Sequence, residues 1–103
     1  MSSKLFVLIR TEGLTVAQQA VQAGHAVAAW LSVFPAFWRN ETLVYIQVPT
    51  ERDLRFYVAI FDSRSIKYVS YADIDLGEEY TAIATGDVLA VRYTKKLPLW
   101  GIP

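Results

Sequence analysis

The chain has 103 residues, of which 53% are hydrophobic and 14% aromatic, and its ten basic side chains balance ten acidic ones. A chain of this length folds as one domain around one core, and its apolar content excludes disorder. The absence of cysteine excludes disulfides and thiol chemistry, and a single histidine argues against a zinc site. We therefore expect one domain over residues 1–103 that holds no metal and no cofactor.

The sequence contains no segment of the kind that crosses or enters a membrane. No apolar run approaches the roughly 18 residues that a bilayer-spanning helix requires. The opening residues, MSSKLFVLIRTEG, contain one lysine and too short an apolar stretch for a signal peptide. We expect a soluble, cytoplasmic protein with no membrane partner.

The first quarter of the chain predicts a buried strand followed by a helix. Residues Leu5–Ile9 are apolar without alternation, which indicates a strand covered on both faces. Thr15 is placed as the N-cap of the helix, and Gln18 completes a capping box three residues later. At about 3.6 residues per turn, mostly small residues share the face that we expect to lie close to the sheet: Ala17, Ala20, Val21, Gly24, Val27, Ala28 and Leu31. Gln18, Gln22 and His25 cluster on roughly the opposite face.

The middle of the chain predicts a connector, a second strand and a second helix. Residues 32–41 carry a proline and three aromatic side chains, and form either a short helix or a cap over the core. Residues 43–48 indicate another largely apolar strand. Thr50 is expected to cap the second helix, whose apolar residues recur with helical spacing at Leu54, Tyr57, Val58 and Phe61.

The last third predicts two more strands and an apolar tail. Residues 66–71 and 81–85 are typical of strands, and the loop between them carries four carboxylates. Residues 88–93 fit either a strand or one buried helical turn, and residues 97–100 form a tail that is tied down if its tryptophan packs. Strands that alternate with helices favour helices on the sheet faces. The predicted fold class is α/β, a three-layer α/β/α domain with a four-stranded mixed β-sheet.

Several of these motifs stand together in a familiar order. A lysine-led apolar strand, KLFVLIR at residues 4–10, is followed by the acidic Glu12 and by Gln22-Ala23-Gly24-His25-Ala26 on the first helix. They resemble the type II peptidyl-tRNA hydrolase family, whose first strand ends in arginine and whose helix bears Gln-x-x-His-Ala. The similarity continues over residues 44–54 and ends with residues 93–99, so it covers nearly the whole chain. It implies a peptidyl-tRNA hydrolase II-like fold.

The resemblance also implies an activity, because members of that family hydrolyse the ester between a peptide and tRNA without a metal. It places a catalytic centre at His25, Asp75 and Thr81, with Asp73 as the other candidate for the acid. A histidine titrating near neutrality can orient a water, and a threonine hydroxyl can steady an oxyanion. The expected contacts to tRNA or peptidyl-tRNA come from Lys4, Gln18, Gln22, Arg92, Lys95 and Lys96.

Two positions depart from the family pattern and define an alternative. Gln18 stands where the family has an active-site lysine, and Glu12 stands where it has aspartate. A glutamine cannot supply the lysine's positive charge. The alternative is therefore a non-catalytic relative that binds RNA, a nucleotide or a protein partner through the same cleft. The abundance of aromatic side chains makes a homodimer a further expectation.

Overall fold

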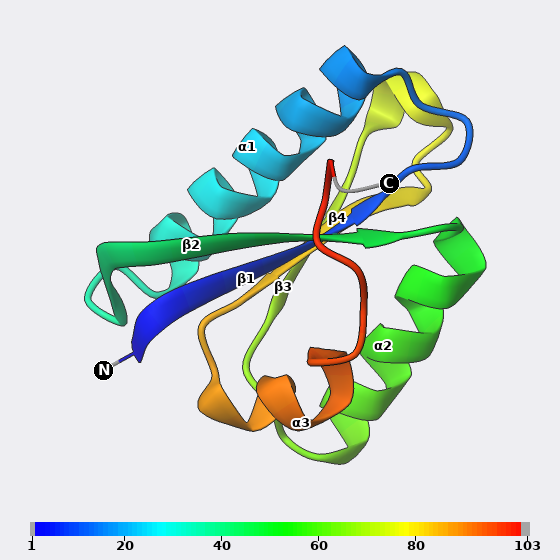
Figure 1. Cartoon of the computed structure of the whole chain (residues 1–103). Coiled ribbons are helices and arrows are strands. Elements are labelled where there is room, and N and C mark those ends of the chain that lie inside the picture. The colour runs from blue at the N-terminus through cyan, green and yellow to red at the C-terminus, as the bar shows by residue number, and fades with distance from the viewer. Residues whose placement is uncertain (1, 102–103) are drawn as a thin grey trace.

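One mixed sheet of four strands organises the chain, in the order β2-β1-β4-β3 (Figure 1). The computed structural model describes residues 2–101, with side chains for all but the first two of them. β1 (Ser2–Arg10) pairs in parallel with β2 (Trp38–Val48), and β4 (Tyr80–Thr85) runs antiparallel to both β1 and β3 (Val69–Ala72). The α/β class and the four-stranded mixed sheet predicted from the sequence are confirmed.

Two long helices connect the strands, and capping residues set where each begins. α1 (Val16–Val33) begins after Thr15, whose hydroxyl accepts from the Gln18 backbone N–H at 3.1 Å. The Gln18 side chain in turn accepts from the Thr15 N–H at 2.8 Å. α2 (Glu51–Ser63) begins after Thr50 with the same reciprocal pair of hydrogen bonds. Both predicted N-caps are confirmed, because a capping box satisfies free helix N–H groups within a few residues of sequence.

β1 is buried on both sides, because a helix lies over each face of the sheet (Figure 1). The cluster on the α1 side includes Leu5, Val7, Ile9, Ala23, Ala26 and Trp30. The cluster on the α2 side includes Leu8, Ile46, Val48, Leu54 and Phe61. Successive residues of a strand point to opposite faces, so residues 5–9 of β1 must all be apolar to supply both clusters.

α1 covers the sheet with a different face from the one predicted. It buries five side chains with helical spacing: Gln19, Gln22, Ala23, Ala26 and Trp30. Val21 and Leu31 are 55% and 39% exposed, and a Cβ added to Gly24 would meet no atom within 4 Å. The predicted face was wrong because burial of the large Trp30 ring outweighs burial of the small residues.

The connector between α1 and β2 caps the core and forms the start of β2. β2 begins at Trp38, so the end of the 32–41 segment is strand and not helix. The rings of Phe34 and Phe37 lie 4.4 and 5.6 Å from the Trp30 ring, between centroids. Of the two alternatives for this segment, the cap over the core is confirmed.

Two segments in the last third of the chain differ from the prediction or decide between its alternatives. β3 begins at Val69, so only the second half of the 66–71 segment pairs as a strand. Residues 88–93 are helical: η2 (Val88–Ala90) leads directly into α3 (Val91–Thr94). A short apolar run cannot distinguish a strand from a buried helical turn, because both bury such residues.

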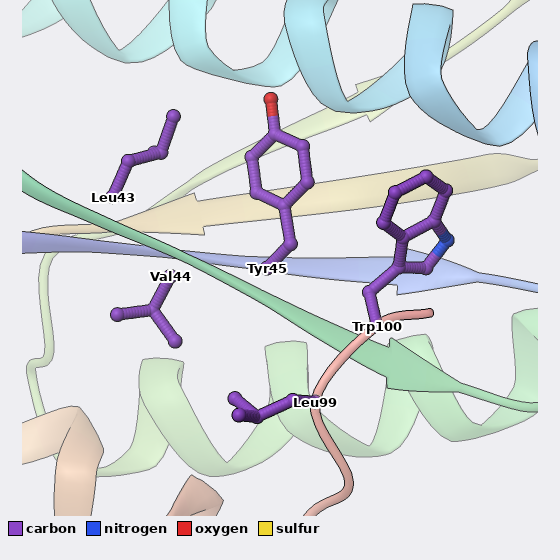
Figure 2. Close-up of a pocket in the computed structure, with 5 residues that line it drawn as sticks. All are labelled: Leu43, Val44, Tyr45, Leu99 and Trp100. Atoms are coloured by element: carbon purple, nitrogen blue, oxygen red, sulfur yellow. The ribbon is translucent and has the colours of Figure 1, made fainter. Parts of the chain in front are cut away.

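The C-terminal tail lies along the outer edge of β2 (Figure 2). The Gln47 N–H donates to the Pro98 carbonyl at 3.0 Å, and the Trp100 N–H donates to the Tyr45 carbonyl at 2.9 Å. The Trp100 indole N–H also donates to Gln19 Oε1 at 2.8 Å, so the predicted packing of the tail through its tryptophan is confirmed. The tail thereby covers part of an edge strand, leaving an apolar groove lined by Leu43, Val44, Tyr45, Leu99 and Trp100.

Replacing Gly86 with alanine is expected to destabilise the fold. An added Cβ would lie 2.8 Å from Cζ2 of Trp30, whose ring is fully buried and cannot move aside. Overpacking of this kind costs about 1–3 kcal/mol. Urea unfolding followed by tryptophan fluorescence measures the loss.

Replacing Gly24 with alanine is expected to have the opposite effect. The added methyl group meets nothing within 4 Å, and Gly24 lies inside α1. Alanine in a helix interior is favoured over glycine by up to about 1 kcal/mol, so the free energy of unfolding should rise. A loss of stability in Gly24→Ala would contradict the orientation of α1 described here.

Candidate functional site

Three polar side chains form a hydrogen-bonded chain beneath α1. The Thr81 hydroxyl, on β4, donates to Oε1 of Gln22 at 2.6 Å. Nε2 of Gln22, on α1, donates to Oδ2 of Asp73 at 2.8 Å. Asp73 is the N-cap of the 3-10 turn η1 (Ile74–Leu76), where its Oδ1 accepts from the Asp75 backbone N–H at 2.9 Å. Gln22 thus joins the sheet, the helix and the 73–79 loop at one point.

The inner part of this chain is closed to solvent. Thr81 is 0% exposed and Gln22 is 3% exposed. Besides Gln22, the Thr81 hydroxyl lies 3.4 Å from the Tyr71 carbonyl oxygen. The predicted site residue Thr81 is therefore brought to the polar centre, but its hydroxyl is below the surface that a substrate would touch.

Asp73, and not Asp75, is the acid attached to this chain. The hydrogen bond from Gln22 is the main cause that lowers the pKa of Asp73, and the Asp75 N–H and the charge of nearby His25 act in the same direction. The Asp75 carboxylate is exposed on the neighbouring cleft. The sequence left both acids open as the match, and the geometry distinguishes their positions.

His25 lies on the solvent side of the same region. Its exposed imidazole stacks on the Tyr71 ring, with 4.6 Å between ring centroids and 8° between ring planes. The sequence analysis did not identify Tyr71 as a site residue and placed it only at the end of a strand. No sequence signal identifies it, because the stack forms only once β3 lies beneath α1.

A cleft of about 280 Å³ opens between α1 and η1 beside the polar centre. Its lining residues are Ala17, Gln18, Val21, Gln22, Asp73, Asp75 and Leu76. Gln18 lines it, although its Oε1 is already held by the Thr15 N–H in the capping box. We call this the α1–η1 cleft; it places carboxylates next to apolar walls.

The predicted basic contacts lie elsewhere. Lys4 and Lys95 line a separate pocket of about 180 Å³ together with Phe6, which belongs to the α2 side of the sheet. Arg92 and Lys96 are exposed on or just after α3. The predicted site residues therefore fall into two groups, because α1 lies over one face of the sheet whereas α3 packs with α2 on the other.

The described residues set two further limits on the site. Within residues 2–101, neither α1 nor α2 combines the length and apolar character that a membrane span requires. Side chains of His, Asp and Glu in the same range do not gather in threes as they would around a metal ion. The α1–η1 cleft is built from two carboxamides, two carboxylates and apolar walls.

The fold and the cleft define a small α/β domain with a buried polar centre under its first helix. No protein-family model matches the chain, and no curated protein matches it. Among solved structures, the chain is similar to Atu0240 from Agrobacterium tumefaciens strain C58, a protein of unknown function, with a TM-score of 0.72 and 13% sequence identity. The match covers 96% of this chain and 98% of that one. At this identity the likeness shows the fold alone.

Replacing Gln22 with methionine is expected to raise the pKa of Asp73 and to destabilise the fold. The buried Thr81 hydroxyl would lose its closest acceptor, which costs about 1–3 kcal/mol. A carboxylate whose pKa is lowered on folding adds stability above its unfolded pKa, and this stability disappears as the pH falls through the folded value. Wild type should therefore lose more stability on acidification than the variant.

Carbon-13 NMR titration of Asp73 and urea unfolding at several pH values measure both effects. Gln18→Met is the control for the pKa measurement, since Gln18 is an exposed glutamine one turn earlier on α1. It is not used for the unfolding measurement, because it also loses the capping-box bond to Thr15. The pKa of Asp73 should be unchanged in this control. An equal change of this pKa in both variants would show that the hydrogen bond from Gln22 does not set the pKa of Asp73.

Proposed function

We propose that the chain is a non-catalytic relative of the type II peptidyl-tRNA hydrolases, with their three-layer α/β/α arrangement, and that it binds a peptide segment of a partner protein in the α1–η1 cleft. The observation that carries this proposal is the hydrogen-bonded chain Thr81–Gln22–Asp73. Its polar groups bond to one another, so they position the cleft wall and are not available for transfer of a proton.

The residues expected to catalyse ester cleavage are poorly placed for that chemistry. The Thr81 hydroxyl is fully buried and donates a hydrogen bond to Gln22, so it cannot reach an ester carbonyl. Gln18 occupies the place of the family lysine, and its carboxamide is neutral and engaged by Thr15. Developing negative charge is stabilised by preorganised donors aimed at it. These features support binding over hydrolysis.

The lining of the cleft favours a peptide over a nucleic acid. Asp73 and Asp75 place negative charge beside Val21, which is 55% exposed, and beside Leu76. Carboxylates repel a phosphate backbone, whereas they attract the ammonium or guanidinium group of a basic side chain. An apolar wall beside them accommodates an apolar neighbour of that side chain. The proposed ligand is therefore an extended segment with a basic residue next to an apolar one.

Hydrolysis of peptidyl-tRNA is the second candidate, and His25 favours it. Its imidazole is exposed and lies close enough to Asp73 to lower that carboxyl's pKa. An imidazole placed in this way can act as a general base on a water. In that function the exposed Arg92, Lys95 and Lys96 would contact tRNA phosphates.

Peptide binding is expected for acetylated Ala-Lys-Leu-Ala and not for acetylated Ala-Glu-Leu-Ala. In ¹H–¹⁵N spectra the first peptide should shift the signals of Val21, Gln22 and Leu76. Asp75→Asn should weaken binding about two- to fivefold, the value of one exposed ion pair. Glu41→Gln, which removes an exposed carboxylate on β2, is the control and should bind normally. Equal binding of both peptides would contradict the charge argument.

No turnover of a model peptidyl-tRNA by the purified protein is expected. Ester cleavage is followed by separating peptidyl-tRNA from free tRNA, with an authentic hydrolase as the positive control. Turnover that is lost in both His25→Ala and Asp73→Asn would overturn the proposal and establish the second candidate. Tight tRNA binding without cleavage would instead contradict the choice of a peptide as the ligand.

A further inference from the structure

A second cleft lies where the connections of two neighbouring parallel strands diverge. β1 leads into α1 on one face of the sheet, and β2 leads into α2 on the other (Figure 1). The two strands are adjacent and parallel, with Arg10 at the end of β1 paired to Val48 at the end of β2. In α/β sheets such a switch point leaves a crevice outside the carboxyl ends of the strands, and ligands bind there.

The crevice at this position has a volume of about 390 Å³. It is lined by Arg10, Glu12, Gly13, Thr50, Glu51, Arg52 and Glu79. We call it the switch-point cleft. It shares none of these residues with the lining of the α1–η1 cleft, so the proposed peptide site does not account for it.

Arg10 is the unusual group in this cleft. Its side chain is 8% exposed, and its Nε has no hydrogen-bond partner among the residues that the structure describes. One terminal nitrogen donates to the Tyr80 carbonyl at 3.4 Å, at the long limit of a hydrogen bond. A guanidinium has five N–H donors, and a buried one is normally paired. Arg10 also lines the cleft, so its incompletely paired guanidinium lies at the inner wall.

The cleft has three carboxylates, of which one is hydrogen-bonded within the protein and two are exposed. Glu51 accepts from Nε of Arg55 at 2.7 Å and from the Tyr80 N–H at 3.3 Å. Glu12 and Glu79 are exposed at the rim. The cleft thus presents a buried positive group at its inner wall, and its mouth holds two exposed carboxylates together with the exposed Arg52.

We infer that the switch-point cleft binds a small zwitterion, a molecule with one carboxylate and one ammonium group, of the class of free amino acids. The planar guanidinium of Arg10 matches a carboxylate by a two-pronged hydrogen-bonded contact. Glu12 and Glu79 receive the ammonium group at the rim. A phosphate carries more negative charge and lacks a cation. It would face both rim carboxylates with only Arg52 to offset them, so a carboxylate that carries its own ammonium group is the better ligand for this site.

The test titrates the protein with 4-aminobutanoate and with alanine, whose charged groups are separated by different distances. Acetate, methylammonium and inorganic phosphate serve as comparisons, each carrying one sign of charge. Binding is measured by ¹H–¹⁵N chemical shifts. At least one zwitterion should bind about tenfold more tightly than acetate or methylammonium, with the shifts centred on Arg10, Glu12 and Glu79.

Two sets of variants separate the roles of the charges. Glu12→Gln and Glu79→Gln remove exposed negative charges, so they should weaken the zwitterion without weakening acetate. Arg10→Lys keeps the charge but loses the planar fork, so it should weaken both ligands. Glu41→Gln is the control for a lost surface carboxylate and should behave as wild type.

The result is decisive even if Arg10→Lys does not fold, because the rim variants and the shift map stand alone. Acetate that binds as tightly as both zwitterions would overturn the inference, as would phosphate that binds more tightly than either. Shifts that map outside the cleft, or no saturable shift for any zwitterion, would overturn it as well. None of these outcomes depends on peptide binding in the α1–η1 cleft.

Discussion

Burial of β1 on both faces is the constraint on which the rest of the molecule depends. Leu5, Val7 and Ile9 reach α1, whereas Leu8 reaches α2, and all four side chains are 0% exposed. A domain of this size has a small margin of stability, so it must bury apolar area efficiently. A central strand that contributes to two clusters does this, and it also places the carboxyl end of β1 next to the start of both helices. The two clefts described above exist because of that placement.

Gln22 shows how a polar group becomes part of such a core. A buried carboxamide is tolerated only when its donors and acceptor are paired. Here Thr81 supplies the donor and Asp73 supplies the acceptor, at 2.6 and 2.8 Å. The bond between Gln22 and Asp73 also fixes the 73–79 loop against α1 and lowers the pKa of Asp73. The proposed binding role would use this rigidity, since a preorganised cleft wall loses little freedom when a ligand arrives.

The distribution of charge gives the molecule distinct surfaces. Carboxylates gather at the carboxyl end of β1, from Glu12 to Asp73, Asp75 and Glu79. The basic residues predicted to meet phosphate lie on the other side of the sheet, where Lys4 and Lys95 share a pocket. An enzyme acting on tRNA would need its phosphate contacts and its polar centre on one surface. This separation is why the acidic clefts are better matched to ligands that carry an amine.

The sequence alone determined the features that depend on neighbours along the chain. The N-caps at Thr15 and Thr50, the apolar run in β1 and the α/β class follow from short-range hydrogen bonding and from periodicity. Only the tertiary structure decided which face of α1 is buried. Trp30 packs against Phe34 and Phe37 in the core, and this orientation of the helix leaves most of the small residues exposed. The tertiary structure also decided that Asp73 joins Gln22, since the two lie 51 residues apart and periodicity carries no record of such a pair. The sequence thus predicted part of the polar centre, because His25 and Gln22 share a helix. The identity of the acid, like the switch-point cleft, depended on the packed sheet.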